Sequence, residues 1–401
     1  MDYNKKSLEL HKKKHGKLEI KSKFPIRNRH DLSIAYTPGV AAVSNELKKH
    51  FKKAFEYTIK GNTVAIISDG SAVLGLGNIG PYAALPVMEG KAILFKKFAN
   101  IDAWPIVLAT QNTEEIIDIV KALAPGFGGI NLEDIAAPRC FEIEKLLQDI
   151  GIPVFHDDQH GAAIVILAAL INAVKVVKKR FENLKIVILG AGAAGTATAN
   201  LLLCLDGVLG ERSIPKNVCT RVREIIVVDR QGIISPYDRK MNLYRKALLL
   251  HTNSEKIKGG IHTALKGADV LIGVSGPNIV TQKMIRSMAE NPIVFALANP
   301  VPEIMPDKAL QAGAKVVGTG RSDFPNQINN VLAFPGVFRG ALDARVARIT
   351  TDMKVAAVYA LANMVRHPSK ERILPSIFQN RVADVVAKAV EKAVKIKPRS
   401  L

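Results

Sequence analysis

The sequence is poor in cysteine and has no long uninterrupted apolar run. Its three cysteines, Cys140, Cys204 and Cys219, match neither a metal-ligand spacing nor a disulfide framework, so we expect packing roles in a reducing compartment. The longest apolar helical candidate, 162–171, has about ten residues and is too short to span a bilayer. Residues 1–23 are polar and rich in lysine, and they show no secretory or transit signal. These absences predict a cytoplasmic protein without a membrane segment.

Acidic residues are scarce relative to basic ones. The chain has 36 Asp and Glu against 56 Lys and Arg, which gives a formal net charge of +20. Such a charge fits either nucleic-acid binding or a lysine-rich surface with a site that attracts anions. The basic clusters carry no interleaved aromatic residues and no nucleic-acid motif, and they are dispersed over 12–14, 48–53, 178–180 and 395–399. We therefore expect no specific nucleic-acid partner.

Apolar residues make up 48% of the chain and aromatic residues 5%, a composition that suits an α/β protein with aliphatic cores. Short β-branched runs alternate with helical patterns, and they predict strands at 63–68, 105–109, 127–132, 153–156, 185–189, 224–229, 270–274, 293–297 and 315–318. The recurrence predicts an α/β fold with an N-terminal α/β domain over 1–160 and a doubly wound, Rossmann-type parallel-sheet domain over 161–401.

Helical patterns complete the alternation. Pro81 can open a helix at its first position, and we expect this helix to end near Glu89-Gly90. Thr113 is expected to cap the helix 113–123. The apolar pattern over 162–177 predicts a long helix that connects the domains. The C-terminal helical segments, 352–366 and 376–394, could pack back on the first domain.

A glycine-rich turn follows the strand at 185–189 directly and leads into a helical pattern. Its residues are Gly190, Gly192, Ala193, Ala194 and Gly195. The glycines permit a tight turn and let backbone N–H groups approach a pyrophosphate, while the helix N-terminus adds partial positive charge. The turn therefore predicts a binding site for NAD or NADP.

Two residues after the next strand bear on the choice between these dinucleotides. A carboxylate at Asp229 would bind the ribose 2′-hydroxyl and repel a 2′-phosphate, which favours NAD. Arg230 could instead pair with the phosphate of NADP.

Residues 75–80 match the glycine pattern a second time. This match does not follow a strand directly, because the apolar run before it ends at Ser68-Asp69-Gly70. We interpret it as a glycine-rich active-site loop.

Carboxylates follow two neighbouring predicted strands. Glu133 and Asp134 come after the strand at 127–132, and Asp157 and Asp158 come after the next one. Open α/β sheets place their sites at these C-terminal strand ends. Hard oxygen ligands suit Mg²⁺ or Mn²⁺. Without a metal, the same residues would be solvated loop acids or helix caps.

Two histidines flank the second pair of acids. His156 and His160 stand four residues apart across a strand–helix junction, a spacing that does not aim both rings at one metal. We expect structural roles for them.

Several long motifs occur in a fixed order along the chain. They are SIAYTPGVA (33–41), SDGSAVLGLGNIGP (68–81), EGKAILFKKFANIDAWP (89–105), NLEDIAAPRCFEIE (131–144), PVFHDDQHGAA (153–163), GAGAAG (190–195), FALANPVPE (295–303) and QINNVLAFPG (327–336). In this order they resemble the short microbial malic enzymes over about residues 18–367. The resemblance implies metal-dependent oxidative decarboxylation of L-malate to pyruvate and CO₂, with reduction of NAD(P)⁺.

The resemblance also implies residue roles. Lys91 would be the general base for the C2 hydroxyl, which requires a lowered pKa. Tyr36 would protonate the enolpyruvate, and Asp157 would tune Lys91 or the metal. The implied metal ligands are Glu133, Asp134 and Asp158. The amides implied to contact the substrate carboxylate or the nicotinamide region are Asn299 and Asn329 or Asn330.

The sequence departs from the family in three places, one of which, Ala42-Val43 where many relatives have Glu-Pro, has no interpretation. Larger malic enzymes have an arginine in the loop where this chain has Ser71-Ala72, so another cation must bind the substrate carboxylate, with Arg321 and Lys96 as candidates. The segment 206–223 lengthens the link between the glycine turn and Asp229, and we expect a surface excursion there.

The resemblance further implies a homodimer, in which the N-terminal arm could bring Tyr36 or Lys91 near a partner's site. Two other functions stay open at this point. One is a malolactic-type reaction, which converts malate to lactate with the cofactor retained. The other is a non-catalytic protein that binds nucleotide or nucleic acid.

Overall fold

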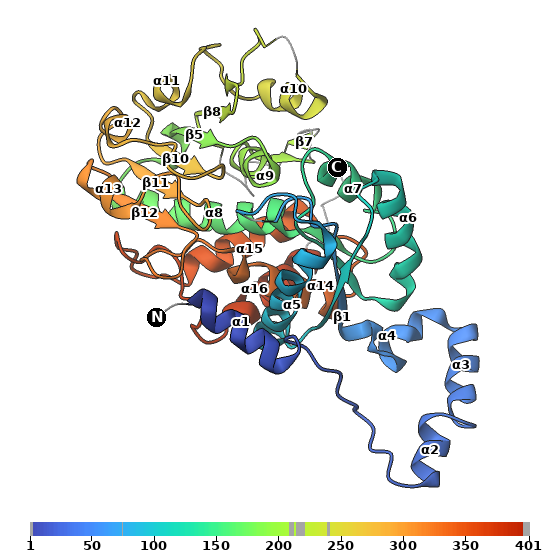
Figure 1. Cartoon of the computed structure of the whole chain (residues 1–401). Helices are drawn as coiled ribbons and strands as arrows, with labels where there is room; N and C mark the ends of the chain where they lie inside the picture. Colours follow the sequence, from blue (N-terminus) through green and yellow to red (C-terminus); the bar gives the residue numbers. More distant parts are fainter. Residues whose placement is uncertain (1–2, 74, 208–211, 214–220, 239–240, 396–401) are drawn as a thin grey trace.

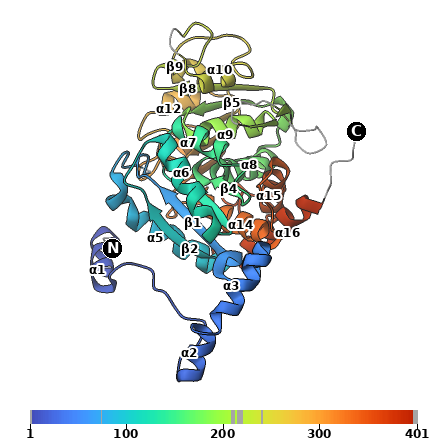
Figure 2. The same ribbon diagram turned by 90° about the vertical axis from the view of Figure 1, so that its right-hand side faces the viewer.

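The computed structural model describes residues 3–73, 75–207, 212–213, 221–238 and 241–395, and two larger sheets organise them (Figures 1 and 2). The first is parallel, with the order β2-β1-β3-β4. Its strands are β1 (Thr63–Ser68), β2 (Asp102–Val107), β3 (Gly129–Leu132) and β4 (Val154–His156). The central strands β1 and β3 are buried along their length, as parallel strands covered on both faces are.

The second sheet has the order β12-β11-β10-β5-β8-β9, in which only the edge strand β9 is antiparallel. Its strands are β5 (Lys185–Leu189), β8 (Glu224–Asp229), β9 (Gly232–Ile233), β10 (Val270–Gly273), β11 (Ile293–Ala296) and β12 (Val316–Thr319). After β5 the chain adds β8 and β9 on one side of this strand, and it then returns to add β10, β11 and β12 on the other side. The glycine turn after β5 therefore lies where the strand order reverses. The predicted α/β class with a doubly wound sheet is confirmed, whereas the boundary between residues 160 and 161 stays a prediction.

The segment that lengthens the link before β8 contains a short antiparallel pair, β6 (Leu205–Asp206) and β7 (Arg212–Ser213). Most of this segment lies outside the described residues. Cys204, which precedes β6, is disulfide-bonded, so the expectation of a free packing cysteine is wrong there. Cys140 is free and buried, and Cys219 lies outside the described residues.

The N-terminal residues form an arm that projects from the body, as Figures 1 and 2 show for α2 and α3. Its elements are α1 (Tyr3–Lys14), α2 (Arg29–Ala35), α3 (Val40–Lys49), η1 (Phe51–Lys53), α4 (Ala54–Tyr57) and η2 (Ile59–Asn62). Helices α1, α2 and α3 contain no buried residue. Within the described chain, the arm therefore has exposed apolar side chains that no core covers.

Helices α5 (Gly80–Ala99), α6 (Thr113–Leu123) and α7 (Arg139–Leu146), with η3 (Ala124–Gly126), cover the first sheet. The prediction that α5 ends near Gly90 is wrong. The helix continues because Met88, Ala92 and Phe95 maintain a buried face past the glycine. The α6 cap is Asn112, whose side chain accepts from two backbone N–H groups, and not Thr113.

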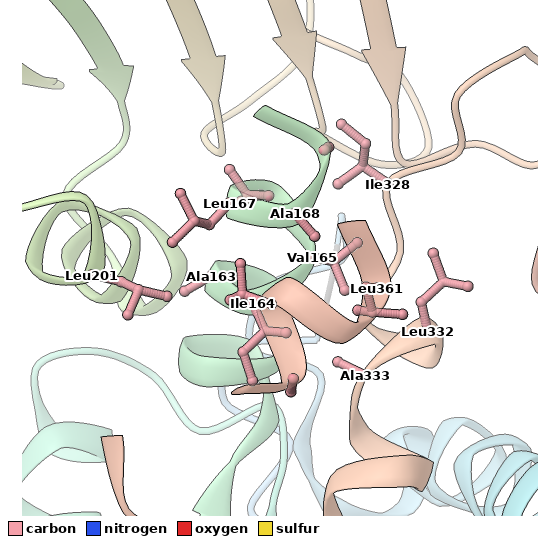
Figure 3. Packing of buried hydrophobic residues seen from close by; sticks show 14 of the residues in the cluster. Ala163, Ile164, Val165, Leu167, Ala168, Leu201, Ile328, Leu332, Ala333 and Leu361 are labelled. Atoms are coloured by element: carbon pink, nitrogen blue, oxygen red, sulfur yellow. The ribbon is translucent and has the colours of Figure 1, made fainter. Parts of the chain in front are cut away.

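The longest helix, α8 (Asp157–Val177), begins at the acidic turn itself, five residues before the predicted start. It is long and apolar enough to cross a membrane, but 72% of that stretch is buried inside the fold. Figure 3 shows Leu167 of this helix directed toward Leu201 and Val165 directed toward Leu361. Burial on several sides identifies α8 as a core helix, and it explains why its apolar pattern shows no single face.

The remaining helices lie around the second sheet and α8. They are η4 (Phe181–Asn183), α9 (Ala193–Leu202), α10 (Leu243–Leu249), α11 (Ile261–Leu265), α12 (Gln282–Arg286), α13 (Pro306–Gln311), η5 (Asn330–Leu332), α14 (Phe334–Asp343), α15 (Thr351–Asn363) and α16 (Val382–Lys395). The C-terminal helices contact the first sheet's layer: the rings of Phe334 and Phe338 in α14 lie 4.7 and 5.4 Å from that of Phe95 in α5. One apolar core therefore runs from β1 to α16.

The glycine turn yields a test of the fold. A Cβ at Gly195 would lie 1.8 Å from the carbonyl oxygen of Gly190, whereas a Cβ at Gly192 would meet nothing within 4 Å. We expect Gly195→Ala to lower the free energy of unfolding by about 1–3 kcal/mol, because α9 must shift away from β5. Gly192→Ala should leave it unchanged. Chemical denaturation without nucleotide measures both, and equal stabilities would contradict the close helix–strand contact.

Candidate active site

The acidic residues predicted from the sequence meet at the C-terminal edge of the first sheet. Glu133 and Asp134 follow β3, and Asp157 and Asp158 form the first turn of α8 after β4. Because β3 and β4 are parallel neighbours, their C-terminal ends bring the two pairs together. Ligand oxygens of Glu133, Asp134 and Asp158 lie within 4.8 Å of one another.

Lys91 reaches this cluster from the middle of α5. Its Nζ donates to Oε1 of Glu133 at 2.6 Å and to Oδ2 of Asp157, and it lies 4.3 Å from the centre of the Phe334 ring. Only 7% of the Lys91 side chain is exposed. The ion pairs are therefore largely shielded from water, and α14 covers them through Phe334.

The expected lowering of the Lys91 pKa is absent from this arrangement. Burial alone would lower the pKa of Lys91, but the charges of Asp157, Glu133 and Asp158 outweigh burial and raise it. Lys91 is therefore an ammonium among these carboxylates.

Burial raises the pKa values of the carboxylates, whereas burial alone lowers the pKa of Lys91. It raises the pKa values of Glu133, Asp157 and Asp158, and it raises the pKa of Asp134 to about 9, with neighbouring acids adding to the effect. Oδ1 of Asp157 is buried without a hydrogen-bond partner. Four acids with one lysine among them form an electron-rich donor set that fits a divalent cation.

The loop that follows β1 makes hydrogen bonds to the segment that carries Glu133 and Asp134. Ser71 Oγ accepts from the backbone N–H of Ala136 at 2.9 Å, and the N–H of Ala72 donates to the carbonyl of Asp134 at 2.9 Å. The fully buried Asp69 pairs with Arg139 at 2.9 Å. The sequence does not predict the role of Arg139, because its partner Asp69 lies 70 residues away and the residues around Arg139 give no indication of the pair.

The two cations considered for the substrate carboxylate differ in position. Lys96 pairs with Asp102 at the start of β2, which is the N-terminal edge of the sheet and the wrong end for the site. Arg321 donates to the carbonyl of Pro300 at 3.2 Å and pairs with Asp323. Arg321 therefore lies beside the Asn299-Pro300 loop, whereas Lys96 is excluded.

The amides predicted to bind ligand lie on two loops. A Cβ at Gly75 would meet the carbonyl oxygen of Asn299 at 2.2 Å, so the glycine-rich loop 75–80 contacts the Asn299 loop. Asn330 has its Cβ 3.3 Å from the position that a Cβ at Gly161 would take, beside the Asp157 turn. Asn329 caps η5 through its side-chain oxygen, which accepts from the N–H of Val331.

The dinucleotide turn has the expected geometry. Gly190 has a φ of 124°, and Gly192 is the N-cap of α9, in which Ala193, Ala194 and Gly195 form the first turn. Asp229 accepts from the N–H of Gln231 and pairs with Arg245 at 2.5 Å, whereas Arg230 is exposed. Arg245 also escaped the sequence analysis, because it belongs to a helix 16 residues beyond Asp229.

Tyr36 lies apart from the cluster. It is the C-cap of α2 on the projecting arm, and 67% of it is exposed. Among the described contacts, none joins its side chain to Lys91 or to the four acids. Within one chain, the structure therefore brings together the lysine and the acids but not the tyrosine.

Comparisons with known proteins agree with this geometry. Residues 159–395 match the family model of the malic enzyme NAD-binding domain, and residues 15–118 and 110–148 match that of the malic enzyme N-terminal domain. The chain belongs to the malic enzyme family. The resemblance found in the sequence motifs is thereby confirmed.

Individual relatives extend the family assignment over nearly the whole chain. The NAD-dependent malic enzyme of Geobacillus stearothermophilus is 53% identical over 94% of this chain and 76% of its own length. The bifunctional malic/malolactic enzyme of Bacillus subtilis (strain 168) is 51% identical over 98% and 93%. The crystal structure of the NAD-dependent malic enzyme from Thermotoga maritima superimposes with a TM-score of 0.88 at 47% identity, over 96% of this chain and 98% of that one.

Removal of Lys91 tests the buried ion pairs. We expect Lys91→Met to lower the free energy of unfolding by about 3–5 kcal/mol, because it leaves Glu133 and Asp157 without their counter-charge. The pKa values of these acids then rise further in the folded state, so the folded protein binds more protons than the unfolded chain. The loss should therefore grow as the pH rises from about 5 to about 8.

Denaturant unfolding across this pH range, without metal, measures the effect. Lys96→Met is the matched control, because its pair with Asp102 is solvent-exposed and should contribute less than about 1 kcal/mol. A pH-independent loss in Lys91→Met, or a loss equal to that of the control, would contradict the ion-pair interpretation.

Proposed function

We infer that this chain catalyses the oxidative decarboxylation of L-malate to pyruvate and CO₂ with reduction of NAD(P)⁺. The observation that carries this inference is the buried contact of Lys91 with Glu133 and Asp157 beside the Glu133, Asp134 and Asp158 cluster, in a chain whose relatives are NAD- and NADP-dependent malic enzymes. The reaction needs a base for the C2 hydroxyl next to groups that stabilise negative charge on the same oxygen. Lys91 would be this base, and the carboxylates of Glu133, Asp134 and Asp158 would hold a cation that stabilises the negative charge.

We propose Mg²⁺ or Mn²⁺ as the metal, held by Glu133, Asp134 and Asp158. Two observations support a cation at this position: the buried Oδ1 of Asp157 has no hydrogen-bond partner, and the pKa values of the acids are raised. When bound, such an ion supplies Lewis-acid stabilisation of the charge that develops on the substrate oxygen.

Lys91 then acts through its Nζ atom. Positive charge placed among the carboxylates weakens the field that holds the Lys91 proton, which moves the pKa of Lys91 down toward the range of a base. A neutral Nζ accepts the C2 hydroxyl proton, and Asp157 keeps the amine oriented. Phe334 excludes water from one side of the amine.

We propose NAD⁺ as the preferred hydride acceptor. The carboxylate of Asp229 lies at the end of β8, where it would meet the ribose hydroxyls. Arg245 pairs with this carboxylate and is a cation that could bind a 2′-phosphate, whereas Arg230 has an exposed side chain. Use of NADP⁺ would therefore depend more on Arg245 than on Arg230.

We further propose that Tyr36 reaches the active site of a second copy in a homodimer, where it protonates C3 of the enolpyruvate. Its exposure on a projecting arm supports an exchange between subunits. The arm has other exposed apolar side chains that a partner would cover: Ile20, Phe24, Ile26 and Ile34 are each more than half exposed, at 81%, 64%, 58% and 56%.

A malolactic reaction on the same site is the second candidate, favoured by the name of the Bacillus subtilis relative, a bifunctional malic/malolactic enzyme. It would return the hydride to pyruvate and release lactate, without net reduction of the dinucleotide. A non-catalytic role is disfavoured, because Lys91 and all four acids remain assembled.

Absorbance at 340 nm with L-malate, Mn²⁺ and either NAD⁺ or NADP⁺ tests the reaction. We expect metal-dependent reduction, abolished by EDTA and lowered by about 10²–10⁴-fold in Lys91→Ala, because the proton acceptor is missing. Arg245→Ala should lower the rate with NADP⁺ relative to NAD⁺, with Arg230→Ala as its control. Lactate without net reduction would favour the malolactic candidate, and no product with either dinucleotide would contradict both.

Mixed dimers test the exchange of Tyr36. Tyr36→Phe and Lys91→Ala should each be nearly inactive, because each lacks one proton-transfer group in every site. If Tyr36 acts in the partner's site, a dimer of one chain of each kind has one site with both residues intact. Mixing and reassembly should then recover up to about half of the activity per mixed dimer. No recovery in verified mixed dimers would show that both residues act within one chain.

A further inference from the structure

Glu144 in α7 is a buried charged residue that the proposed chemistry does not use. Only 4% of it is exposed, and it lies outside the cluster of Glu133, Asp134 and Asp158. A buried carboxylate away from the reacting groups is costly unless its hydrogen bonds are satisfied. Its partners therefore indicate what it does.

Three donors from a single turn converge on the Glu144 carboxylate. The backbone N–H of His156 donates to Oε1 at 3.1 Å, and Nε2 of Gln159 donates to Oε2 at 3.0 Å. Nε2 of His160 lies 2.9 Å from Oε1 and 3.0 Å from Oε2. These donors flank Asp157 and Asp158 on both sides, so one carboxylate fixes both ends of the turn that carries them.

The same contacts continue to a helix on the far side. Nζ of Lys354 in α15 lies 3.2 Å from Nδ1 and 3.3 Å from Nε2 of His160. Burial alone would raise the pKa of Glu144, but its interaction with His160 and the charge of Lys354 lower it to about 2. The carboxylate is therefore charged, and its hydrogen bonds to the turn are charge-assisted.

We propose that Glu144 is a positioning residue that holds Asp157 and Asp158 in the geometry required for metal binding and for the contact with Lys91. This inference rests on the metal-dependent function proposed above. Glu144 touches none of the reacting groups, and it acts through the backbone and side chains of residues 156–160. Groups that orient metal ligands in this way contribute about 10–100-fold to metal affinity.

Mn²⁺ binding to the 401-residue chain, measured by electron paramagnetic resonance without malate or dinucleotide, tests the inference. We expect Glu144→Gln to weaken Mn²⁺ binding by about 10–100-fold, because an amide has one acceptor oxygen for three donors. NADH binding, measured by fluorescence, should not change. Glu142→Gln is the matched control: it removes the same charge from the same helix, but Glu142 is exposed.

The Mn²⁺ affinity of every variant is measured well below its melting temperature, so that all the protein is folded. If Glu144 only stabilised the fold, its substitution would lower the melting temperature but leave the Mn²⁺ affinity of the folded protein unchanged. Wild-type affinity in folded Glu144→Gln would overturn the inference and leave the proposed function intact. Absence of Mn²⁺ binding in the wild type would overturn both.

Two milder variants decide the matter if Glu144→Gln does not fold. Gln159→Met removes one donor to the carboxylate, and Lys354→Met removes the cation behind His160. We expect both to weaken Mn²⁺ binding in the same direction as Glu144→Gln, with smaller effects. Wild-type affinity in both would overturn the inference.

Discussion

The buried contact between Lys91 and the carboxylates of Glu133 and Asp157 constrains how four elements of the fold meet. Ions in a water-poor interior are tolerated only when their partners are held in place. Three elements must therefore meet at one point: the middle of α5, the end of β3 and the start of α8. A fourth, α14, supplies Phe334 as the cover. The packing of these four elements keeps the charges together.

The parallel arrangement of the strands is enough to bring the site residues together at one edge of the sheet. Both sheets place their loops at the C-terminal ends of their strands, and α8 starts at the edge of the first sheet and packs against α9 of the second. The acidic turn and the glycine turn after β5 are thus connected through one apolar core. Gly75, close to Asn299, closes the gap between the loops of the two sheets. A ligand that spans both turns would contact segments that are joined by this core.

Much of this could be predicted from the sequence, for local reasons. The strands β1, β5 and β8 have the predicted bounds, because β-branched runs end abruptly in Ser, Gly or Asp. The acids of the cluster were found because they follow strands. Long-range features were missed: the burial that carries α5 past Gly90, the partner of Asp229 in α10, and the pairing of Arg139 with Asp69. None of these leaves a periodic signal in a single sequence.

Burial and charge at the acidic cluster affect both the stability of the fold and the proposed chemistry. The same burial that raises the pKa of Asp134 to about 9 makes the cluster receptive to a cation. The same carboxylates raise the pKa of Lys91 and keep it from acting as a base. One event, the arrival of positive charge, would relieve both conditions. In the proposed reaction, Lys91 would become basic only when a cation lies among these carboxylates, so its raised pKa is compatible with the proposed role as a base.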